Sequence, residues 1–425
     1  MVLQFFRSGW KALLLIAMIL ILLPACRNKT PDGQSTLTES GQTADADSPS
    51  PDDMANTLAD LLASAQDKYM CGDASLYYEF QDQPPAAFSE ICDELEREGY
   101  ERYSSWEISQ NRFVTYRNGK NMRHIGYLGE TSTLTVVTSK LAGDFLPAVG
   151  EEYQPVCQPS VTQIGSWHLN GMGYIIQFAD GSFAILDGGY ADCAEELYNQ
   201  LCKLNGSPDR IRVRAWILSH AHPDHYDCFS SFASVYGLRI APECIMVAMP
   251  NYNDCENTYF HDNLRSVTDN FLNGSDIPIL GVHTGMTFRF ADTTLEMIYS
   301  PDSLFHDSAP SDFNESSIIL RVSNENGSAI FLGDAGNAAC SFAVKHFGDT
   351  LKSDMVQVSH HGCETATLTI YSRIRAAVLF WPCDHELYDS SRNALVKYQL
   401  RQLDSTKVNY LQSDGSQTVL FASLR

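Results

Sequence analysis

Four side chains able to hold a metal ion lie within the six residues 220–225 of this chain: His220, His222, Asp224 and His225. They directly follow the apolar run 215–218, which is typical of a buried strand. Positions two apart in extended backbone face the same side, so the first two histidines can close on one ion. Pro223 then bends the chain, because its ring fixes φ and removes an N–H, and the Asp-His pair beyond it can turn toward a second ion.

These ligand types indicate which metal to expect. Imidazole and carboxylate together suit zinc, with manganese or iron as the alternatives at an open, oxygen-rich site. The competing interpretation is a surface histidine patch, or a turn in the core whose imidazoles bond to backbone. A single histidine would favour that interpretation, whereas H-x-H-x-D-H after an apolar strand favours a metal site, for which later residues must supply further ligands.

Composition narrows the class of protein. The chain has 425 residues, enough for two or three domains, and its 44% hydrophobic content indicates a globular protein. Lys and Arg total 29 against 52 Asp and Glu, a formal charge of -23. This charge repels phosphate backbones and disfavours tight nonspecific binding of nucleic acid, unless a local basic groove exists. The 12 cysteines include no C-x-x-C pair, so neither a zinc ribbon nor a thioredoxin-type motif is indicated.

The N-terminal 26 residues are typical of an export signal, with a basic start, the apolar run 12–23 and the ending Leu-Pro-Ala-Cys26. This ending resembles a bacterial lipobox, which implies that a lipid on Cys26 anchors the protein at the outer face of the bacterial cytoplasmic membrane. Ordinary cleavage, or retention as an uncleaved anchor, is the alternative. Residues 27–56 are Pro, Ser, Thr, Asp and Gly with few apolar side chains, and predict a disordered tether.

Residues 57–147 predict a small α+β domain. The segment 86–98 has apolar residues at three- and four-residue spacing, as an amphipathic helix does. Strand-like runs separated by turn residues follow, at 100–106, 112–117, 121–128 and 132–137. We expect a helix packed on an antiparallel meander that serves as a scaffold or recognition module, since no catalytic constellation falls within it.

A second pattern covers about 161–425 and places polar residues at the ends of apolar strands. A hairpin over 171–189 ends in Asp187-Gly188-Gly189, the segment 194–204 predicts a helix, and the strand 211–218 leads into the histidine cluster. Three later stretches continue the pattern: a polar turn and strand at 313–320, a strand at 329–334 ending in Gly-Asp334, and a strand at 355–362 ending in His360-His361-Gly.

This order of motifs resembles the metallo-β-lactamase superfamily over 161–425. The resemblance implies an α/β fold, namely the four-layered αββα metallo-β-lactamase sandwich with its metals between two sheets, preceded here by the small α+β domain. It also implies that Asp334 bridges two ions and that the His-His-Gly stretch supplies the last histidine ligand. Within the superfamily the chain looks similar to the extracellular domain of bacterial DNA-uptake competence proteins and to the phosphorylcholine esterases of Gram-positive bacteria.

The chain departs from that pattern in three places. Tyr174 stands where the competence branch usually has Asp, and 226–228 is Tyr-Asp-Cys where a Gly-Gly is common. No histidine falls in a strand-end motif between His225 and Asp334, and we expect those present to be exposed rather than ligands: His261, His283 and His306. The first metal would then have few protein ligands and form the open, substrate-facing site.

The motifs and the resemblance together assign each ligand to the first metal, to the second metal or to both. His220 and His222 take the first metal, Asp224 and His225 take the second, and Asp334 bridges both. One of His360 and His361 completes the second site, and the sequence leaves open which, because adjacent residues of a strand face opposite ways. The other would orient a ligand or donate a proton to the leaving group. The expected catalytic residues are Asp224, His360 and His361. Asp187 either supports the metal ligands by hydrogen bonding or is a plain turn residue.

Two such ions about 3.5–4 Å apart lower the pKa of a bridging water toward neutrality and stabilise the charge that builds on attack. The expected reaction is therefore hydrolysis by a metal-bridging hydroxide. A phosphodiester or phosphomonoester fits, because two cations can clamp the attacking and leaving oxygens, while lactones, lactams and thioesters use the same nucleophile. The resemblance favours the phosphoester.

Candidate substrate-pocket residues lie near the last histidines, where the stretch 380–388 closes a strand and enters a loop. Trp381, His385 and Tyr388 could line the pocket mouth, with Asn314 of the polar turn, and stack on a base or box a choline cation. The alternative is that Trp381 belongs to the core and that His385 is solvated.

Three functions compete on this basis. The first is a membrane-anchored, extracytoplasmic dinuclear hydrolase of small or cell-envelope phosphoesters, with zinc as the expected metal, manganese as the alternative and no obligate protein partner. The second is an exported nuclease of the competence type, which the acidic charge disfavours. The third is a non-catalytic, metal-stabilised binding module.

Overall fold

The computed structural model describes residues 57–65, 67–70, 75–140, 152–248, 277–305, 313–363, 366, 368–403 and 407–424. The predicted signal 1–26 and tether 27–56 lie outside these ranges, as do His261 and His306. Within these ranges no helix combines the length and the apolar character needed to cross a membrane.

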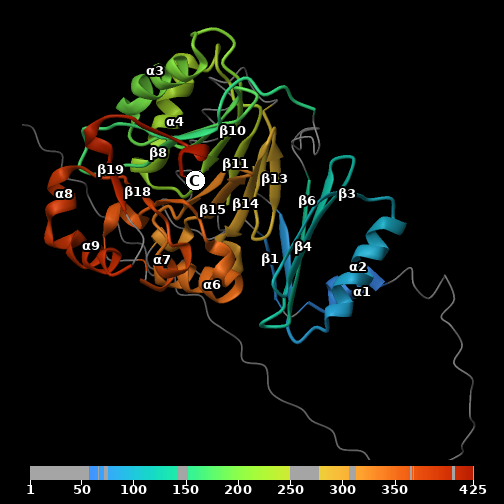
Figure 1. The fold of residues 1–425 in the computed structure, drawn as a ribbon. Coiled ribbons are helices and arrows are strands. Elements are labelled where there is room, and N and C mark those ends of the chain that lie inside the picture. The colour runs from blue at the N-terminus through green and yellow to red at the C-terminus, as the bar shows by residue number, and fades with distance from the viewer. Residues whose placement is uncertain are drawn as a thin grey trace, which may run out of the picture. The chain divides into compact units, whose positions relative to one another are not determined.

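The first of two seven-stranded sheets is half parallel and half antiparallel (Figure 1). Its order is β12-β11-β10-β9-β8-β7-β20, in which β9 to β12 run parallel and the remaining neighbours antiparallel. The predicted hairpin is β8 paired with β9. The strands are β7 (Ser160–Gln163), β8 (Gly173–Gln177), β9 (Phe183–Asp187), β10 (Val213–Leu218), β11 (Ile245–Val247), β12 (Ile279–Gly281) and β20 (Gln417–Leu420).

The second sheet has the same division, with antiparallel neighbours from β13 to β16 and parallel neighbours from β16 to β19. Its order follows the chain, β13-β14-β15-β16-β17-β18-β19. The strands are β13 (Thr287–Phe290), β14 (Thr293–Tyr299), β15 (Ile319–Asn324), β16 (Gly327–Phe331), β17 (Met355–Gln357), β18 (Val378–Trp381) and β19 (Val408–Leu411).

Side-chain alternation along the strands builds four layers. In β10, Ala215 and Ile217 belong to the core between the two sheets, whereas Trp216 and Leu218 face the helices that cover the first sheet. Because both faces are covered, the strand is a continuous apolar run. The covering helices are α3 (Ala194–Asn205) and α4 (Pro223–Tyr236) on the first sheet, and α6 (Asn337–Phe347), α7 (Leu368–Ile374) and α9 (Ala394–Arg401) on the second. The expected α/β fold is confirmed at the level of two mixed sheets and an additional antiparallel sheet.

A third, six-stranded antiparallel sheet precedes the sandwich, with the order β1-β2-β6-β5-β4-β3. The predicted meander is its β3 to β6, and the helices α1 (Thr57–Ala63) and α2 pack on one face in a separate apolar cluster. The prediction missed β1 and β2. The elements are α2 (Pro85–Arg97), β1 (Asp67–Met70), β2 (Leu76–Phe80), β3 (Glu101–Ile108), β4 (Asn111–Asn118), β5 (Asn121–Leu128) and β6 (Thr133–Lys140).

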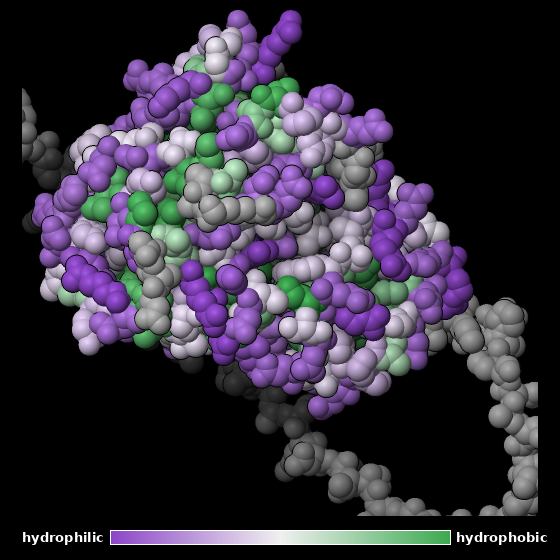
Figure 2. Space-filling model, viewed as in Figure 1, coloured by the Kyte–Doolittle hydropathy of each residue, from purple (hydrophilic) through white to green (hydrophobic). Residues whose placement is uncertain are grey.

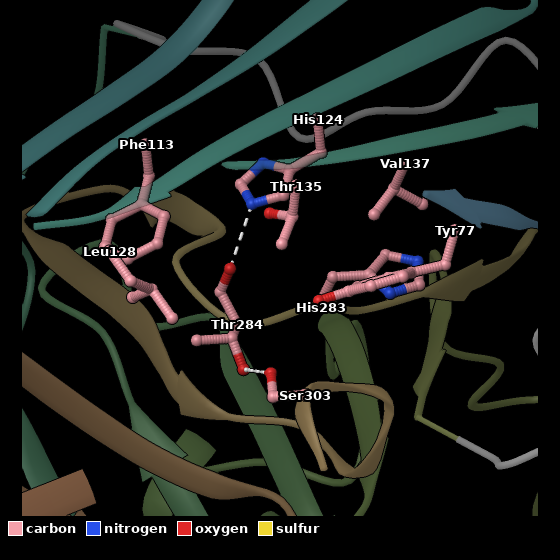
Figure 3. A pocket seen from close by; sticks show the side chains of 9 residues that line it. All are labelled: Tyr77, Phe113, His124, Leu128, Thr135, Val137, His283, Thr284 and Ser303. Atoms are coloured by element: carbon pink, nitrogen blue, oxygen red, sulfur yellow. Dashed lines mark hydrogen bonds between the residues drawn. The ribbon is translucent and has the colours of Figure 1, made fainter. Parts of the chain in front are cut away.

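The other face of this sheet contacts the sandwich. The Trp106 ring stacks on Phe347 at 5.5 Å between centroids, and the Nε2 of His124 lies 2.9 Å from the Thr284 carbonyl oxygen. Figure 3 shows this contact around a void of about 10 Å³, room for about one water molecule. His283 lies at the same interface, buried with its Nδ1 2.7 Å from the Asp302 carboxylate, so the expectation that it is exposed was wrong. This interface is packed too closely to take a substrate.

The visible surface is mainly polar. Hydrophilic side chains cover most of the face drawn in Figure 2, and the hydrophobic ones form smaller groups among them.

Candidate metal centre

The histidine cluster lies between the end of β10 at Leu218 and the start of α4 at Pro223. The bend predicted at the proline is this helix start, where proline is tolerated because its missing N–H would have no helical partner. His222 is the N-cap residue in extended backbone, and Asp224 lies in the first turn. The unpaired N–H groups of that turn favour a negative charge there.

Two groups of ligand atoms converge at this loop. The first consists of His220, His222 and Asp334, and the second of Asp224, His225, Asp334 and His361; within each, the donor atoms all lie within 4.8 Å of one another. The Nε2 of His220 is 3.0 Å from the Nδ1 of His222 and 3.9 Å from the Asp334 Oδ2. In the second group, the Nε2 of His225 is 3.2 Å from the Asp334 Oδ1. Asp334 is common to both groups, as a bridging carboxylate would be.

The turn that carries Asp334 is fixed by hydrogen bonds from the neighbouring strand. The Gln357 side chain accepts from the Leu332 N–H at 2.7 Å and donates to the Gly333 carbonyl at 2.9 Å. The Ser317 hydroxyl accepts from the Asp334 N–H at 3.0 Å. Gly333 has φ 55, and a Cβ there would lie 2.9 Å from the Ser317 Cβ, so only glycine fits this turn. The carboxylate is thus placed by the end of β16.

His360 and His361 both point toward Asp334, which the sequence could not establish. The strand β17 has already ended, and both histidines adopt left-handed backbone, with φ 49 and φ 56. Consecutive residues in this conformation do not alternate between faces as strand residues do. The Nε2 of His361 lies 3.0 Å from the Asp224 Oδ2 and 3.3 Å from the Asp334 Oδ2, while the Nε2 of His360 lies 3.9 Å from the latter. His361 therefore belongs to the second group, and His360 lies beside the first.

The second nitrogen of two of these rings is held by a fixed acceptor. The His225 Nδ1 is 2.8 Å from the Asp187 Oδ2, and the His361 Nδ1 is 2.8 Å from the Pro382 carbonyl oxygen. Asp187 is fully buried and also accepts from the Ser219 N–H at 2.7 Å and the Ser219 hydroxyl at 2.6 Å. An Nδ1–H that donates in this way leaves Nε2 as the lone-pair atom facing the centre. Asp187 therefore supports the ligands by hydrogen bonding, rather than acting as a plain turn residue.

The charges of the second group balance one another. Burial alone would lower the pKa of His361, but the Asp334 and Asp224 carboxylates raise the pKa to about 9. Burial likewise opposes protonation of His225, yet the same carboxylates hold its pKa well above the usual range. Burial lowers the pKa of His220 well below its usual value, with a further contribution from the His225 charge. One end of the centre thus attracts positive charge strongly, and the other offers a neutral imidazole.

These residues fit divalent metal ions. The His225 Nε2, the His361 Nε2 and the Asp334 Oδ1 are buried and form no well-aligned hydrogen bond, although carboxylate oxygens lie 3.0 to 3.3 Å from the two nitrogens. Buried polar atoms are normally satisfied, and three such atoms aimed at one space indicate a missing cation. Imidazole nitrogen and carboxylate oxygen are the donor set of zinc sites. The ligand clusters are therefore consistent with metal binding.

The structure corrects most of the predicted pocket mouth. Trp381 is 1% exposed and donates its indole N–H to the Asn409 side chain, so it belongs to the core. Tyr388 packs edge-on against that indole at 4.8 Å, and His385 is exposed and pairs with Asp414. Their chain segment continues into the helix α8 (His385–Asp389). Asn314 alone lies at the centre, with its Nδ2 3.4 Å from the His360 Nε2.

Sequence reasoning missed Asn170, which contacts a ligand, and Tyr190, which contacts Asn170. Asn170 donates its Nδ2–H to the Asp224 Oδ2 at 2.6 Å, and the Tyr190 hydroxyl donates to the Asn170 Oδ1 at 3.3 Å. The nearby Gly171 N–H faces the His361 Nδ1 at 3.4 Å. The loop before β8 thus positions Asp224. An isolated Asn in a loop carries no motif, although its place just before the Gly-x-Gly opening of the hairpin was a usable signal.

Comparison with known proteins gives low similarities. No family model matches the sequence, and no curated protein matches it. Among solved structures, the chain is similar to a mutant of CmlA beta-hydroxylase (TM-score 0.38, 10% identity, 63% of this chain, 55% of that one). The chain therefore spans about half the length of that protein. It is also similar to Zn(2+)-bound PqqB from Methylobacterium extorquens (TM-score 0.36, 9% identity, 61% of this chain, 99% of that one). A third similarity is to unliganded yeast PDE1 (TM-score 0.39, 9% identity, 62% of this chain, 100% of that one). Similarities of this size decide neither family nor reaction, and the sheet topology and the ligand geometry weigh more on both questions.

Proposed function

We propose that this protein is an exported hydrolase of phosphoesters, anchored to the outer face of the membrane through its N-terminus, that works with two divalent ions, zinc by ligand preference. The observation that carries the proposal is Asp334, whose carboxylate belongs to both ligand groups. A shared carboxylate sets two ions side by side, which is the arrangement that favours displacement at phosphorus.

The ions would lower the pKa of a water between them and balance the charge that builds on the ester. The chain's own residues position the metal ligands and assist proton transfer. Asp187 and the Pro382 carbonyl fix the tautomers of His225 and His361, and Asn170 fixes the Asp224 carboxylate. The His360 side chain is 21% exposed and 3.9 Å from Asp334, placed to pass a proton to a leaving oxygen.

The substrate class follows from charge and anchoring. A chain with a formal charge of -23 repels long polyanions, so a small or cell-envelope phosphoester suits the protein better than nucleic acid. The apolar run and Leu-Pro-Ala-Cys26 ending support a lipid anchor, and the Pro- and Ser-rich segment after it supports a tether to the membrane face.

The proposal is tested by metal analysis of the purified chain, coupled to turnover of bis-p-nitrophenyl phosphate, p-nitrophenyl phosphate, a lactone, a lactam and DNA. We expect two ions at the centre and hydrolysis of the phosphoesters. The Asp334→Ala variant should lose both ions and activity together. The matched control is Asp302→Asn, which alters another buried His–Asp pair, at 2.7 Å, outside the two ligand groups.

Other outcomes separate the competing functions. Retention of both ions by Asp334→Ala would refute the bridging assignment. Salt-sensitive DNA degradation would favour the nuclease, and two bound ions without turnover of any substrate would favour the binding module.

A further inference from the structure

A second set of metal-binding side chains lies outside this centre. His168, Asp192 and Cys193 each offer one donor atom, and the three atoms lie within 4.8 Å of one another. The His168 Nε2 and the Asp192 Oδ1 are 2.7 Å apart, and these side chains are 21% and 49% exposed, whereas Cys193 is buried. Imidazole nitrogen, carboxylate oxygen and thiolate sulfur are the three donor types that zinc takes in proteins. A surface His–Asp pair alone needs no ion, and the buried thiol beside it is what sets this group apart.

The rest of the fold holds these side chains in place. The His168 ring lies against Trp167 at 4.0 Å and Tyr190 at 4.4 Å between centroids. The His168 carbonyl accepts from the Gln412 side chain at 3.2 Å, and the Cys193 N–H donates to the Tyr190 carbonyl at 3.0 Å. A ligand set restricted in this way loses little conformational freedom when an ion binds.

The position of Cys193 suits a thiolate ligand. Cys193 lies where the 3-10 turn 191–193 enters α3, close to the positive end of the helix dipole, which favours negative charge on sulfur, while burial raises the thiol pKa. A bound cation would offset this effect of burial, because its positive charge stabilises the thiolate. Gly189 leaves room for the sulfur, because a Cβ there would lie 3.1 Å from the Cys193 Sγ. The Cys193 thiol donates to the Ser166 hydroxyl at 3.6 Å, and after the thiol loses its proton this hydroxyl can donate to the sulfur instead.

We propose that His168, Asp192 and Cys193 bind a third divalent ion, zinc by ligand preference, with water in the fourth position. The Cys193 thiol releases its proton to solvent as the sulfur–metal bond forms. The His168 proton that Nε2 donates to Asp192 moves through solvent to Nδ1, so that Nε2 can bind the metal and two metal–ligand bonds replace the His168–Asp192 hydrogen bond. With zinc–nitrogen and zinc–oxygen bonds of about 2.0–2.1 Å at a tetrahedral angle, these two atoms must separate to about 3.3 Å. Starting from 2.7 Å, small side-chain rotations achieve this.

The ion would stiffen the loops beside the centre without joining it. Tyr190, which packs on His168, donates its hydroxyl to Asn170, and Asn170 donates to Asp224. The third ion is therefore a structural support for the loop that positions Asp224. It does not depend on the proposed hydrolytic reaction.

The test is titration of the metal-free full chain with cobalt(II), followed by the thiolate-to-cobalt charge-transfer absorption in the near ultraviolet. The two ligand groups of the centre contain no cysteine, and among the groups of metal ligands in the described residues the third site alone has one, so the band is assigned to that site. We expect the band in the unaltered chain. Cys193→Ser should lose the band and bind one cobalt ion fewer. Asp192→Asn is a milder change and should raise the cobalt concentration needed to develop the band by at least about tenfold.

Two controls make the result decisive. Cys157→Ser removes a half-buried thiol outside any group of metal ligands and should keep the band. Asp334→Ala should also keep the band while losing the ions of the centre. The third site and the proposed hydrolytic centre are therefore tested separately. A cobalt-loaded chain without the band, or a band that persists in Cys193→Ser, would overturn the third site.

Discussion

The hydrogen bonds of Asp187 allow the effect of a single-atom change to be worked out. Its carboxylate accepts from the Ser219 N–H, the Ser219 hydroxyl and the His225 Nδ1–H. In Asp187→Asn, one oxygen becomes an NH2 group. The serine hydroxyl can rotate and accept from it, but the His225 Nδ1–H cannot. The imidazole must either lose this partner or move its proton to Nε2, which is the atom that faces Asp334.

Both outcomes weaken the centre. Loss of a charge-assisted hydrogen bond in the interior costs about 2–3 kcal/mol, and loss of an outer hydrogen bond to a metal-binding histidine costs about 10–100-fold in metal affinity. We therefore expect Asp187→Asn to bind the ion of the second group at least about tenfold more weakly. Titration against a competing chelator at neutral pH measures the metal affinity. Urea unfolding of the metal-free chain measures the free energy lost with the hydrogen bond.

The matched control is Asp180→Asn. Asp180 also accepts from a serine N–H and hydroxyl, those of Ser182, at 3.0 Å and 2.6 Å, but it lies in the turn at the opposite end of β9. This variant should keep its metal affinity. An Asp187→Asn chain that binds the ion as tightly as the control would refute the tautomer argument, and equal losses in both variants would point to a general loss of folding.

Two further predictions concern stability. In the metal-free chain the pKa of His361 is raised to about 9, so its stabilising protonation is fully present below the unfolded pKa of about 6.5 and is lost as pH rises through about 9. Urea unfolding should therefore show a decrease on the order of 3 kcal/mol across that range in chelator, and constant stability there would contradict the charge balance. Trp381→Ala should lower the unfolding free energy by about 3–5 kcal/mol and leave the KM for a phosphoester unchanged, because the indole fills the core. Steady-state kinetics and urea unfolding of this variant test the prediction. A raised KM with unchanged stability would indicate instead that Trp381 lines the substrate pocket.

The sequence contained enough to predict the ligand stretch and the layers. His220, His222, Asp224 and His225 could be predicted to face one space because a buried strand and a proline fix the local geometry over six residues. The apolar runs of β10 and β16 indicated strands covered on both faces. Such features depend on neighbours along the chain, which the sequence displays directly.

Features that depend on distant neighbours could not be predicted. The two left-handed residues His360 and His361 are fixed by contacts with other strands, such as the hydrogen bond from the His360 N–H to the Gly333 carbonyl at 3.1 Å. Trp381 follows an apolar run, and whether its ring faces core or mouth depends on how α8 packs. Asn170 lies 54 residues from Asp224, and the Gly-x-Gly that follows it indicated a tight turn without indicating which side chain it would contact.

The pairing of β7 with β20 joins segments 256 residues apart, as in the bond between the Thr162 and Thr418 hydroxyls. A chain synthesised from its N-terminus contains β7 long before β20. The opening strand of the sandwich therefore waits with an unpaired edge, exposed to chaperones and to aggregation, until the closing strand arrives. The first sheet can therefore be completed only after the last strand of the chain has been made.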